Sequence, residues 1–403
     1  MNAFKNIGPA TLVTAAFIGP GTVTLCTIAG VGFGHSLLWA LLFSVFATIS
    51  LQEMSARIGL ITGKGLAEVI TQNSMKPYIR YLSVSLILTA IIAGNLAYEA
   101  GNISGAGIGL QLFVKPENLE SDAGTFKWIN LLIGFIAFII LYFGNYKTLE
   151  KVLVFSVLIM SLSFVLTAFI VSPSITSIIQ GLFIPSIDSQ NILTVIALIG
   201  TTVVPYNLFL HASLVSKKWD SSNQLQHVRR DTYISIGVGG IISMSIIVCA
   251  ASMQGREIGN LNDLAVGLEP LFGTAAKYIL ALGMMAAGLS SSITAPLAAA
   301  FVAKECLNWS EDTKSFKFRC VWIIILIAGV LFSTLGIQPI HVIKFAQVIN
   351  GILLPVSTAF VLWIINKKSI MHEFINSRIQ NMIALIVFGI TLFLGVKSIY
   401  AVL

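Results

Sequence analysis

Gly-Thr-Thr-Val-Val-Pro-Tyr-Asn-Leu-Phe-Leu-His, residues 200–211, is the stretch that decides the fold, and it lies inside a long apolar run without charges. Residues 15–25 form a second stretch of this kind, Ala-Ala-Phe-Ile-Gly-Pro-Gly-Thr-Val-Thr-Leu. A central proline removes a helical hydrogen bond and clashes with the preceding turn, and the glycines beside it add backbone freedom. Both stretches therefore predict helices that are interrupted midway.

The composition around these stretches is that of a membrane protein. Of 403 residues, 56% are hydrophobic and only 10% are charged, with a mean hydropathy of +0.90. A soluble fold has about a quarter of its residues charged, so most of this surface is expected to face lipid. The predicted fold class is therefore all-α integral membrane, with the lipid bilayer as the surrounding medium.

Charge-poor runs predict eleven membrane spans, because one helical crossing needs roughly 20 apolar residues. Residues 6–52 contain no charged side chain and suffice for two crossings, with a turn at Gly32, Gly34 and His35. The other nine runs are 79–112, 126–146, 151–172, 190–216, 231–254, 270–303, 318–336, 339–365 and 378–402.

The positions of Lys and Arg predict the orientation. With a cytoplasmic N-terminus, 18 of the 24 Lys and Arg residues fall in inside segments and 6 in outside segments. We therefore expect the N-terminus in the cytoplasm, the C-terminus outside, and a location in the plasma (inner) membrane. This asymmetry accounts for the net charge of +7 without a nucleic-acid partner. The sequence says nothing about the oligomeric state.

The two interrupted spans are the first and the sixth, so they occupy matching positions in two groups of five. We expect one transmembrane domain of 1–403 with an inverted repeat, 8–172 and 190–365, followed by an additional helix at 378–402. Paired broken helices point to the binding site of a secondary transporter, because freed backbone groups are tolerated in a membrane only where they line an enclosed cavity.

Other functional classes lack support in the sequence. Residues 59–64, Gly-Leu-Ile-Thr-Gly-Lys, lack the spacing and the hydroxyl residue of a phosphate-binding loop. The four cysteines are widely spaced, which favours neither a disulfide framework nor a zinc site. We expect no enzyme activity and no cofactor.

The chain resembles the NRAMP divalent metal transporters over nearly its whole length, and four stretches carry this resemblance. The most specific are residues 55–68, Ser-Ala-Arg-Ile-Gly-Leu-Ile-Thr-Gly-Lys-Gly-Leu-Ala-Glu, and residues 200–215. Residues 290–294 (Ser-Ser-Ser-Ile-Thr) and 346–348 (Ala-Gln-Val) also look like the family. The resemblance implies a LeuT-type fold with eleven transmembrane helices, a 5+5 inverted repeat and broken helices 1 and 6.

The chain departs from the family where the metal is bound, and thus resembles an atypical branch. The family's first break reads Asp-Pro-Gly-Asn, and here Gly19 and Thr22 replace the two metal-binding residues. Its second break reads Met-Pro-His, where this chain has Val204 and Tyr206 around the proline. The usual carboxylate and thioether ligands are therefore both absent.

The remaining polar groups are neutral and rich in oxygen, which is the ligand type of hard cations. A site of this kind suits a largely hydrated Mg²⁺, which gives up its waters reluctantly, better than Mn²⁺ or Fe²⁺. We expect metal contacts from Thr22, Asn207 and Gln347. The predicted substrate-binding set is Gly19, Gly21, Thr22, Thr201, Thr202, Val204, Tyr206, Asn207, Gln347 and Asn350.

The residues that resemble the family's proton route are altered as well. The family's third span carries Asp-Leu-Ala-Glu, and residues 95–98 read Asn-Leu-Ala-Tyr, with Glu99 one position later. These changes argue against proton coupling. The candidates for it are Glu99, which is costly to place in a span unless it is protonated, paired or near water, and His211, for which a hydrogen-bonded structural role is favoured.

Two other functions fit the same sequence. A Gly-Pro-Gly break exposes N–H groups at a helix N-terminus, which favour anions, so a LeuT-fold carrier of a small organic substrate such as an amino acid is the first alternative. A membrane receptor that binds without transport is the second, and it leaves the paired breaks without a purpose.

Overall fold

The helices are described here from a computed structural model. It describes residues 8–10, 14, 18–73, 76–114, 123–143, 147–255, 258, 261–309 and 313–402, and these contain helices and no strand. The α-helices are α2 (Pro20–Phe33), α3 (Leu38–Thr62), α4 (Leu66–Asn73), α5 (Pro77–Val114), α6 (Ala123–Phe143), α7 (Lys147–Val171), α8 (Ile175–Phe183), α9 (Ile192–Thr202), α10 (Pro205–Lys218), α11 (Leu225–Ala251), α12 (Leu261–Ala265), α13 (Glu269–Phe272), α14 (Ala276–Leu307), α15 (Phe316–Ser333), α16 (Pro339–Ile365), α17 (Lys368–Met371) and α18 (Arg378–Val402).

Ten spans among the described residues are long and apolar enough to cross a membrane. The difference from the eleven predicted spans is the first one, of which α2, with 14 residues, is the second half. Most of its first half lies outside the described residues. The remaining predicted spans match observed helices, and the pair α9 and α10 matches the predicted run 190–216.

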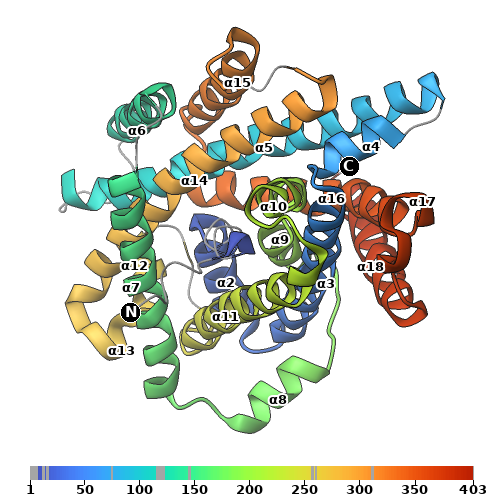
Figure 1. Ribbon diagram of the computed structural model, residues 1–403. Coiled ribbons are helices and arrows are strands. Elements are labelled where there is room, and N and C mark those ends of the chain that lie inside the picture. Colours follow the sequence, from blue (N-terminus) through green and yellow to red (C-terminus); the bar gives the residue numbers. More distant parts are fainter. Residues whose placement is uncertain are drawn as a thin grey trace, which may run out of the picture.

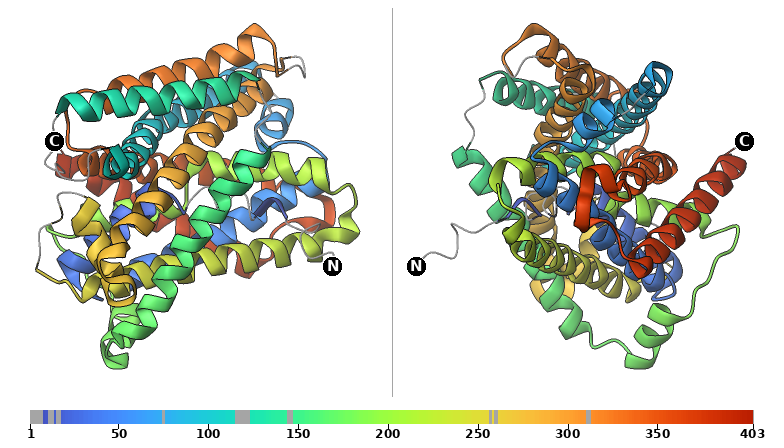
Figure 2. Two further views of the ribbon diagram at one scale, coloured as in Figure 1. Left: turned by 90° about the vertical axis from the view of Figure 1, so that its left-hand side faces the viewer. Right: turned by 45° about the vertical axis from the view of Figure 1, so that its right-hand side comes forward.

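The interrupted helices lie in the middle of the bundle. In Figure 1, α2, α9 and α10 occupy the centre, with α3 and α11 on one side and α5 and α14 on the other. The most apolar 18-residue segment of the α9–α10 span is 94% buried, whereas the corresponding segment of α18 is 28% buried. Figure 2 shows α6 and α15 side by side at the periphery. The breaks are therefore enclosed by protein.

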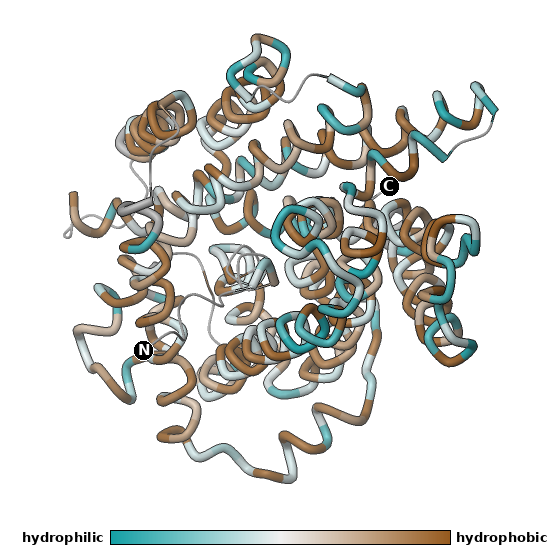
Figure 3. The backbone as a smooth tube through the Cα atoms, in the orientation of Figure 1, coloured by the Kyte–Doolittle hydropathy of each residue, from teal (hydrophilic) through white to brown (hydrophobic). Residues whose placement is uncertain are grey.

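The peripheral helices present apolar side chains outward. Figure 3 shows hydrophobic residues along α6, α15 and α18, and side chains such as Trp128, Phe135 and Ile327 are exposed on them. Outward-facing apolar helices are stable only with lipid around them, because water would make this exposed surface costly. The predicted all-α integral membrane class is confirmed.

Close backbone contacts hold α9 against α16. A Cβ atom added to Gly200 would lie 2.0 Å from the backbone oxygen of Gln347 and 2.7 Å from the nitrogen of Gly351. A Cβ on Gly351 would in turn lie 2.9 Å from the backbone oxygen of Ile196. Small residues permit such close helix packing in membranes, and this contact places Gln347 beside the sixth-span break.

We expect Gly200→Ala to destabilise the protein by roughly 2 kcal/mol, because backbone atoms cannot move aside as a side chain can. The measurement is the thermal midpoint of the purified protein in detergent. Gly237→Ala is the matched control, since a Cβ there meets nothing within 4 Å, and it should raise stability slightly through helix propensity. Equal midpoints for the two variants would contradict the proposed packing.

Candidate functional site

The break in the first span lies directly before α2. Gly19 has an extended backbone (φ −121°, ψ −172°), and Pro20 begins the helix. Proline is favoured at this position because its fixed φ suits a helix and its missing N–H has no helical partner there. The first turn of α2 therefore points its backbone N–H groups into the centre of the protein.

The break in the sixth span joins α9 to α10 through two residues. Val203 leaves the helical conformation (φ −96°, ψ 78°), Val204 has an extended backbone (φ −79°, ψ 124°), and Pro205 begins α10. Both valines are fully buried. The break thus leaves carbonyl groups at the end of α9 and N–H groups at the start of α10 within the protein interior.

The two breaks meet through hydroxyl groups. Oγ1 of Thr22 lies 2.9 Å from Oγ1 of Thr201, although the residues are 179 positions apart. A Cβ on Gly21 would lie 2.3 Å from Nε2 of Gln347 and 3.1 Å from Oγ1 of Thr201. Side chains from α2, α9 and α16 therefore converge at one point. Four residues of the predicted set are brought together there.

Asn207 is the polar residue of this region whose hydrogen bonds are missing. It is 1% exposed, and neither Oδ1 nor Nδ2 has a partner among the described residues. A buried amide that lacks partners costs roughly 1–3 kcal/mol. α10, which carries Asn207, packs against α16 and α5. An amide left in this state is suited to a ligand that restores its hydrogen bonds.

Gln347 and Asn350 are buried one turn apart on α16, each 1% exposed. Nδ2 of Asn350 lies 3.5 Å from Oε1 of Gln347, which is a long contact. Oε1 of Gln347 is thus an acceptor in this weak contact, and both side chains carry an amide oxygen of the kind that a cation or its waters can use. Together with the two threonines they make a set of neutral oxygen donors.

The other members of the predicted set have different surroundings. The hydroxyl of Thr202 donates to the backbone oxygen of Leu198 at 3.0 Å, so it serves its own helix. Tyr206 is 2% exposed, and its ring meets that of Tyr98 from α5 at 5.7 Å in an edge contact. Tyr98, which was not predicted as a site residue, thus forms a wall beside the second break.

Glu99, the next residue of α5, faces away from the contact between Tyr98 and Tyr206. It is fully buried, and a Cβ on Gly329 of α15 would lie 2.4 Å from its Cγ. Asn102 donates to its Oε2 at 3.4 Å, and no ion pair to it occurs among the described residues. Adjacent residues of a helix project about 100° apart, so Tyr98 faces the break while Glu99 faces α15.

His211 lies one turn beyond Asn207 and contacts α3. Its Nδ1 is 2.9 Å from Oε1 of Gln52, and the residue is fully buried. Because an amide oxygen accepts, Nδ1 donates in this contact, which leaves Nε2 as the unprotonated nitrogen of a neutral ring. Nε2 is buried without a partner among the described residues. The hydrogen-bonded structural role predicted for His211 fits this contact.

The donor set at the breaks contains no carboxylate. Among the described residues there is no group of three or more His, Cys, Asp and Glu side chains arranged to hold a metal ion. Cys26, Cys249, Cys306 and Cys320 are free thiols. A cation at the breaks would therefore be held by hydroxyl and amide oxygens, backbone carbonyls and its own waters.

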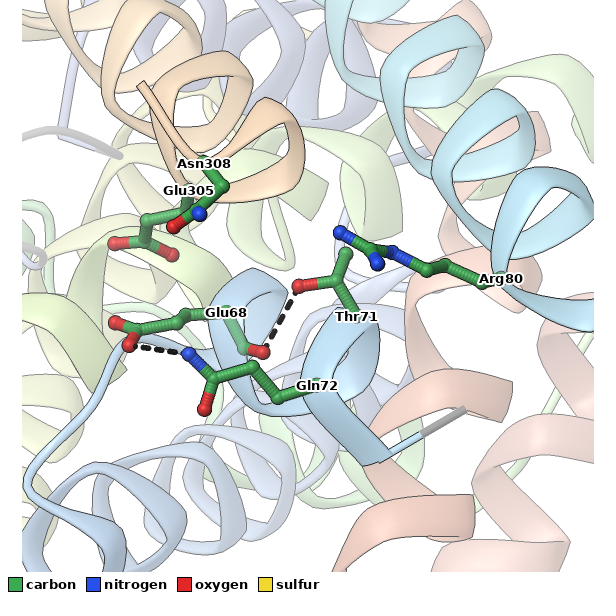
Figure 4. Close-up of a pocket in the computed structure, with 6 residues that line it drawn as sticks. All are labelled: Glu68, Thr71, Gln72, Arg80, Glu305 and Asn308. Carbon is green, nitrogen blue, oxygen red and sulfur yellow. Dashed lines mark hydrogen bonds between the residues drawn. The ribbon is translucent and has the colours of Figure 1, made fainter. Parts of the chain in front are cut away.

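A separate polar cavity of about 290 Å³ lies where α4, the start of α5 and the end of α14 meet. Figure 4 shows the Glu68 and Glu305 carboxylates facing each other across it, with Arg80 on the far side. Ser213 of α10 donates to Glu305. This cavity is lined by side chains of both charges, and no motif in the sequence identified it.

Comparison with known proteins extends these observations. A family model described as "Natural resistance-associated macrophage protein-like" matches residues 10–401. The divalent metal cation transporter MntH of Bacillus subtilis (strain 168) is 26% identical over 409 residues, covering 97% of this chain and 92% of that protein. MntH of Erwinia tasmaniensis is 25% identical, covering 95% and 91%.

Solved structures show the same fold. A manganese transporter of Eremococcus coleocola superposes with a TM-score of 0.77 at 19% identity, covering 99% of this chain and 88% of that one. MhsT, solved in complex with L-phenylalanine, superposes with a TM-score of 0.61 at 13% identity, covering 98% of each chain. The LeuT-type fold with its two broken helices is confirmed.

Proposed function

The chain belongs to the natural resistance-associated macrophage protein-like (NRAMP) family, and from this premise we propose that it is a secondary membrane transporter of divalent metal cations working by alternating access. The observation that supports this most is the contact between the two breaks. The side-chain oxygens of Thr22 and Thr201 lie 2.9 Å apart, and Asn207, Gln347 and Asn350 are each 1% exposed. The side chain of Asn207 is buried without a hydrogen-bond partner among the described residues, and such a group costs stability, so we assign the polar residues at the breaks to a substrate.

The donor set favours Mg²⁺ over Mn²⁺ and Fe²⁺. Transition metals bind better where imidazole or sulfur ligands are present, whereas Mg²⁺ prefers oxygen and keeps several waters. Val204 supplies no thioether, and Gly19 supplies no carboxylate. Waters on a bound cation point their hydrogens outward and need acceptors. The oxygens of Asn207, Thr22 and Gln347 are the acceptors that we propose for this role.

A small organic substrate such as an amino acid is the competing proposal. The start of α2 offers backbone N–H groups, and Asn207 offers an unpartnered Nδ2 donor. Both suit a carboxylate. A substrate carboxylate bound in this way leaves the amide oxygen of Asn207 without a donor. The amino group of an amino acid would supply that donor.

Flux measurements on the purified protein in liposomes separate these functions. We expect uptake of Mg²⁺ that saturates, weaker uptake of Mn²⁺, and no uptake of amino acids. Amino-acid uptake without cation flux would overturn the metal proposal. Binding of Mg²⁺ by calorimetry without any flux would instead favour the receptor function, and protein-free liposomes are the control for leakage.

We further propose that transport is not coupled to protons. Glu99 packs against Gly329 of α15 and Nδ1 of His211 contacts Gln52 of α3, so each is engaged with a helix other than α2 and α9. An inward Mg²⁺ gradient should therefore leave the pH of the lumen unchanged, as recorded with a trapped pH-sensitive dye. Faster acidification of the lumen in the presence of Mg²⁺ would contradict this proposal and make Glu99→Gln and His211→Ala the next variants to assay.

The predicted topology belongs to the same proposal. We propose a cytoplasmic N-terminus, an external C-terminus, the plasma membrane as location, and two inverted repeats at about 8–172 and 190–365. These features place α4, the ends of α3 and α14 and the start of α11 on the cytoplasmic side. Labelling of single cysteines introduced at Asp220 and at Ser186 from opposite sides of the membrane tests the orientation.

A further inference from the structure

Two buried oxygens on α5 lack hydrogen bonds and have no role in the site at the breaks. Asn95 and Glu99 are 1% and 0% exposed, and residues four apart lie on the same face of a helix. Oδ1 of Asn95 and Oε1 of Glu99 are both buried without a hydrogen-bond partner among the described residues. One turn of α5 thus carries two unsatisfied oxygens, and one of them belongs to an ionisable group.

The Glu99 carboxyl is enclosed by α5, α14 and α15, which all pack on one another. A Cβ on Gly329 of α15 would lie 2.4 Å from Cγ of Glu99, and a Cβ on Gly288 of α14 would lie 2.6 Å from the backbone oxygen of Asn102. Ser292, one turn after Gly288, lies beside the Glu99 carboxyl and is 0% exposed. Three helices therefore shield this carboxyl from both lipid and water.

Glu53 shows how another buried carboxylate of this protein is neutralised. Its two oxygens lie 3.0 Å from Arg57 and 2.8 Å from Arg229. Glu99 has no ion pair of this kind among the described residues, and its contact with Nδ2 of Asn102 is long, at 3.4 Å. A charge is tolerated inside a protein only when it is paired. The Glu99 carboxyl therefore requires a positive charge from outside the chain, which a proton or a metal ion can bring.

A metal ion fits the two unsatisfied oxygens better than a proton does. A proton joins two oxygens that are about 2.5–3.0 Å apart, and Oε1 of Glu99 has no hydrogen-bond partner among the described residues. A proton on Oε1 would therefore lack an acceptor, and Oδ1 of Asn95 would still lack a donor. Ca²⁺ binds oxygens at about 2.3–2.6 Å each, and Na⁺ has nearly the same radius. An ion of this size can lie between oxygens that are too far apart to share a hydrogen bond.

The oxygens around this carboxyl suit one monovalent cation. The hydroxyl of Ser292 donates to the backbone oxygen of Gly288 at 2.9 Å, so the lone pairs of the hydroxyl oxygen are left for a cation. Nδ2 of Asn95 donates to the backbone oxygen of Ile91 at 2.8 Å, which leaves its Oδ1 as a ligand. Carboxylate, amide and hydroxyl oxygens are ligands of hard cations, and one positive charge neutralises a single carboxylate.

We propose that α5 and α14 hold a Na⁺ ion, with Glu99 supplying the negative charge and Asn95 and Ser292 supplying neutral oxygens. The ion removes the cost of an uncompensated carboxylate within the membrane and joins the two helices. This site is distinct from the polar residues at the breaks and does not depend on the proposed function, because its occupancy can be measured without transport.

The experiment uses the purified full chain in detergent. The thermal midpoint is recorded while NaCl replaces choline chloride at constant ionic strength, and binding of radiolabelled Na⁺ is measured on the same samples. We expect the midpoint to rise and to saturate at about 3 °C above its value in choline, since an ion that binds the folded state stabilises it. Glu99→Gln keeps the shape of the side chain and removes its charge, so this variant should show neither the rise nor the binding.

Three further variants make the result specific. Asn95→Ala and Ser292→Ala each remove one neutral oxygen and should raise the Na⁺ concentration of half-maximal effect about tenfold. They also give the answer if Glu99→Gln fails to fold. Glu269→Gln removes an exposed carboxylate at the start of α13 and should keep the full response to Na⁺.

An equal response to Na⁺ in the parent and in folded Glu99→Gln would overturn the proposal. A midpoint that depends on pH but not on Na⁺, and that loses its pH dependence in Glu99→Gln, would overturn it as well and show that Glu99 holds a proton. Mg²⁺ flux decides the proposed function separately. A protein that responds to Na⁺ through Glu99 and carries no Mg²⁺ would keep the Na⁺ site and lose only the transport function.

Discussion

Asn207→Ala should abolish Mg²⁺ transport while the protein stays folded. Its Oδ1 and Nδ2 are buried without partners among the described residues, so the amide adds no hydrogen bond to the folded structure. A hydrogen bond to a charged ligand is worth about 1.5–3 kcal/mol. Asn207→Ala removes this hydrogen bond and the amide that orders the waters of the cation. The two losses together correspond to a fall in the initial rate of about a hundredfold.

Stability should move in the opposite direction. Asn207→Leu, which keeps the number and branching of the heavy atoms and removes the unsatisfied polar atoms, should raise the thermal midpoint, because the desolvation cost of the amide disappears. A gain in stability with a loss of function is the mark of a residue kept for a ligand. Asn223→Ala, at an exposed asparagine before α11, is the control for both measurements. Unchanged flux in Asn207→Ala would remove Asn207 from the site.

The membrane spans were predictable because lipid demands long apolar helices. α16 and α18 have the bounds that the charge-poor runs indicated. α3 differs, since it continues to Thr62, well beyond Gln52 where the run ended. Glu53 and Arg57 form a buried pair one turn apart there. A charged residue did not mark the end of this helix, because the two charges neutralise each other within it.

The short helices were not predictable from hydropathy. α4 and α8 have 8 and 9 residues, far below the length that gives a membrane signal. Each packs on a longer element, α4 on α5 and α8 on α3. Their helical form therefore depends on tertiary contacts, because isolated helices of this length are marginal.

The site was predictable in position but not in orientation. Proline and glycine located both breaks, and the meeting of Thr22 with Thr201 follows from two breaks at the same depth. The rotation of α5 about its own axis could not be predicted from the sequence. Its buried residues include apolar, polar and charged side chains, so they do not mark a single buried face. Tyr98 and not Glu99 faces the break.

Gly21→Ala should reduce Mg²⁺ transport by about thirtyfold without unfolding the protein. The added Cβ would lie 2.3 Å from Nε2 and 2.8 Å from Cδ of Gln347. These atoms are the far end of a flexible side chain, so Gln347 can turn away and the helices keep their packing. The amide then no longer faces the cation. The added Cβ would also lie 3.1 Å from Oγ1 of Thr201, which would disturb the hydrogen bond between Thr22 and Thr201.

Flux into liposomes and the thermal midpoint together test this expectation. Gly32→Ala is the matched control in the same helix, because a Cβ there meets nothing within 4 Å. A double variant gives the decisive comparison. If Gly21→Ala acts by displacing the Gln347 amide, then adding it to Gln347→Ala should reduce transport little further, since coupled residues are not additive. Full additivity of the two effects would show that Gly21 acts through the backbone of α2 and not through Gln347.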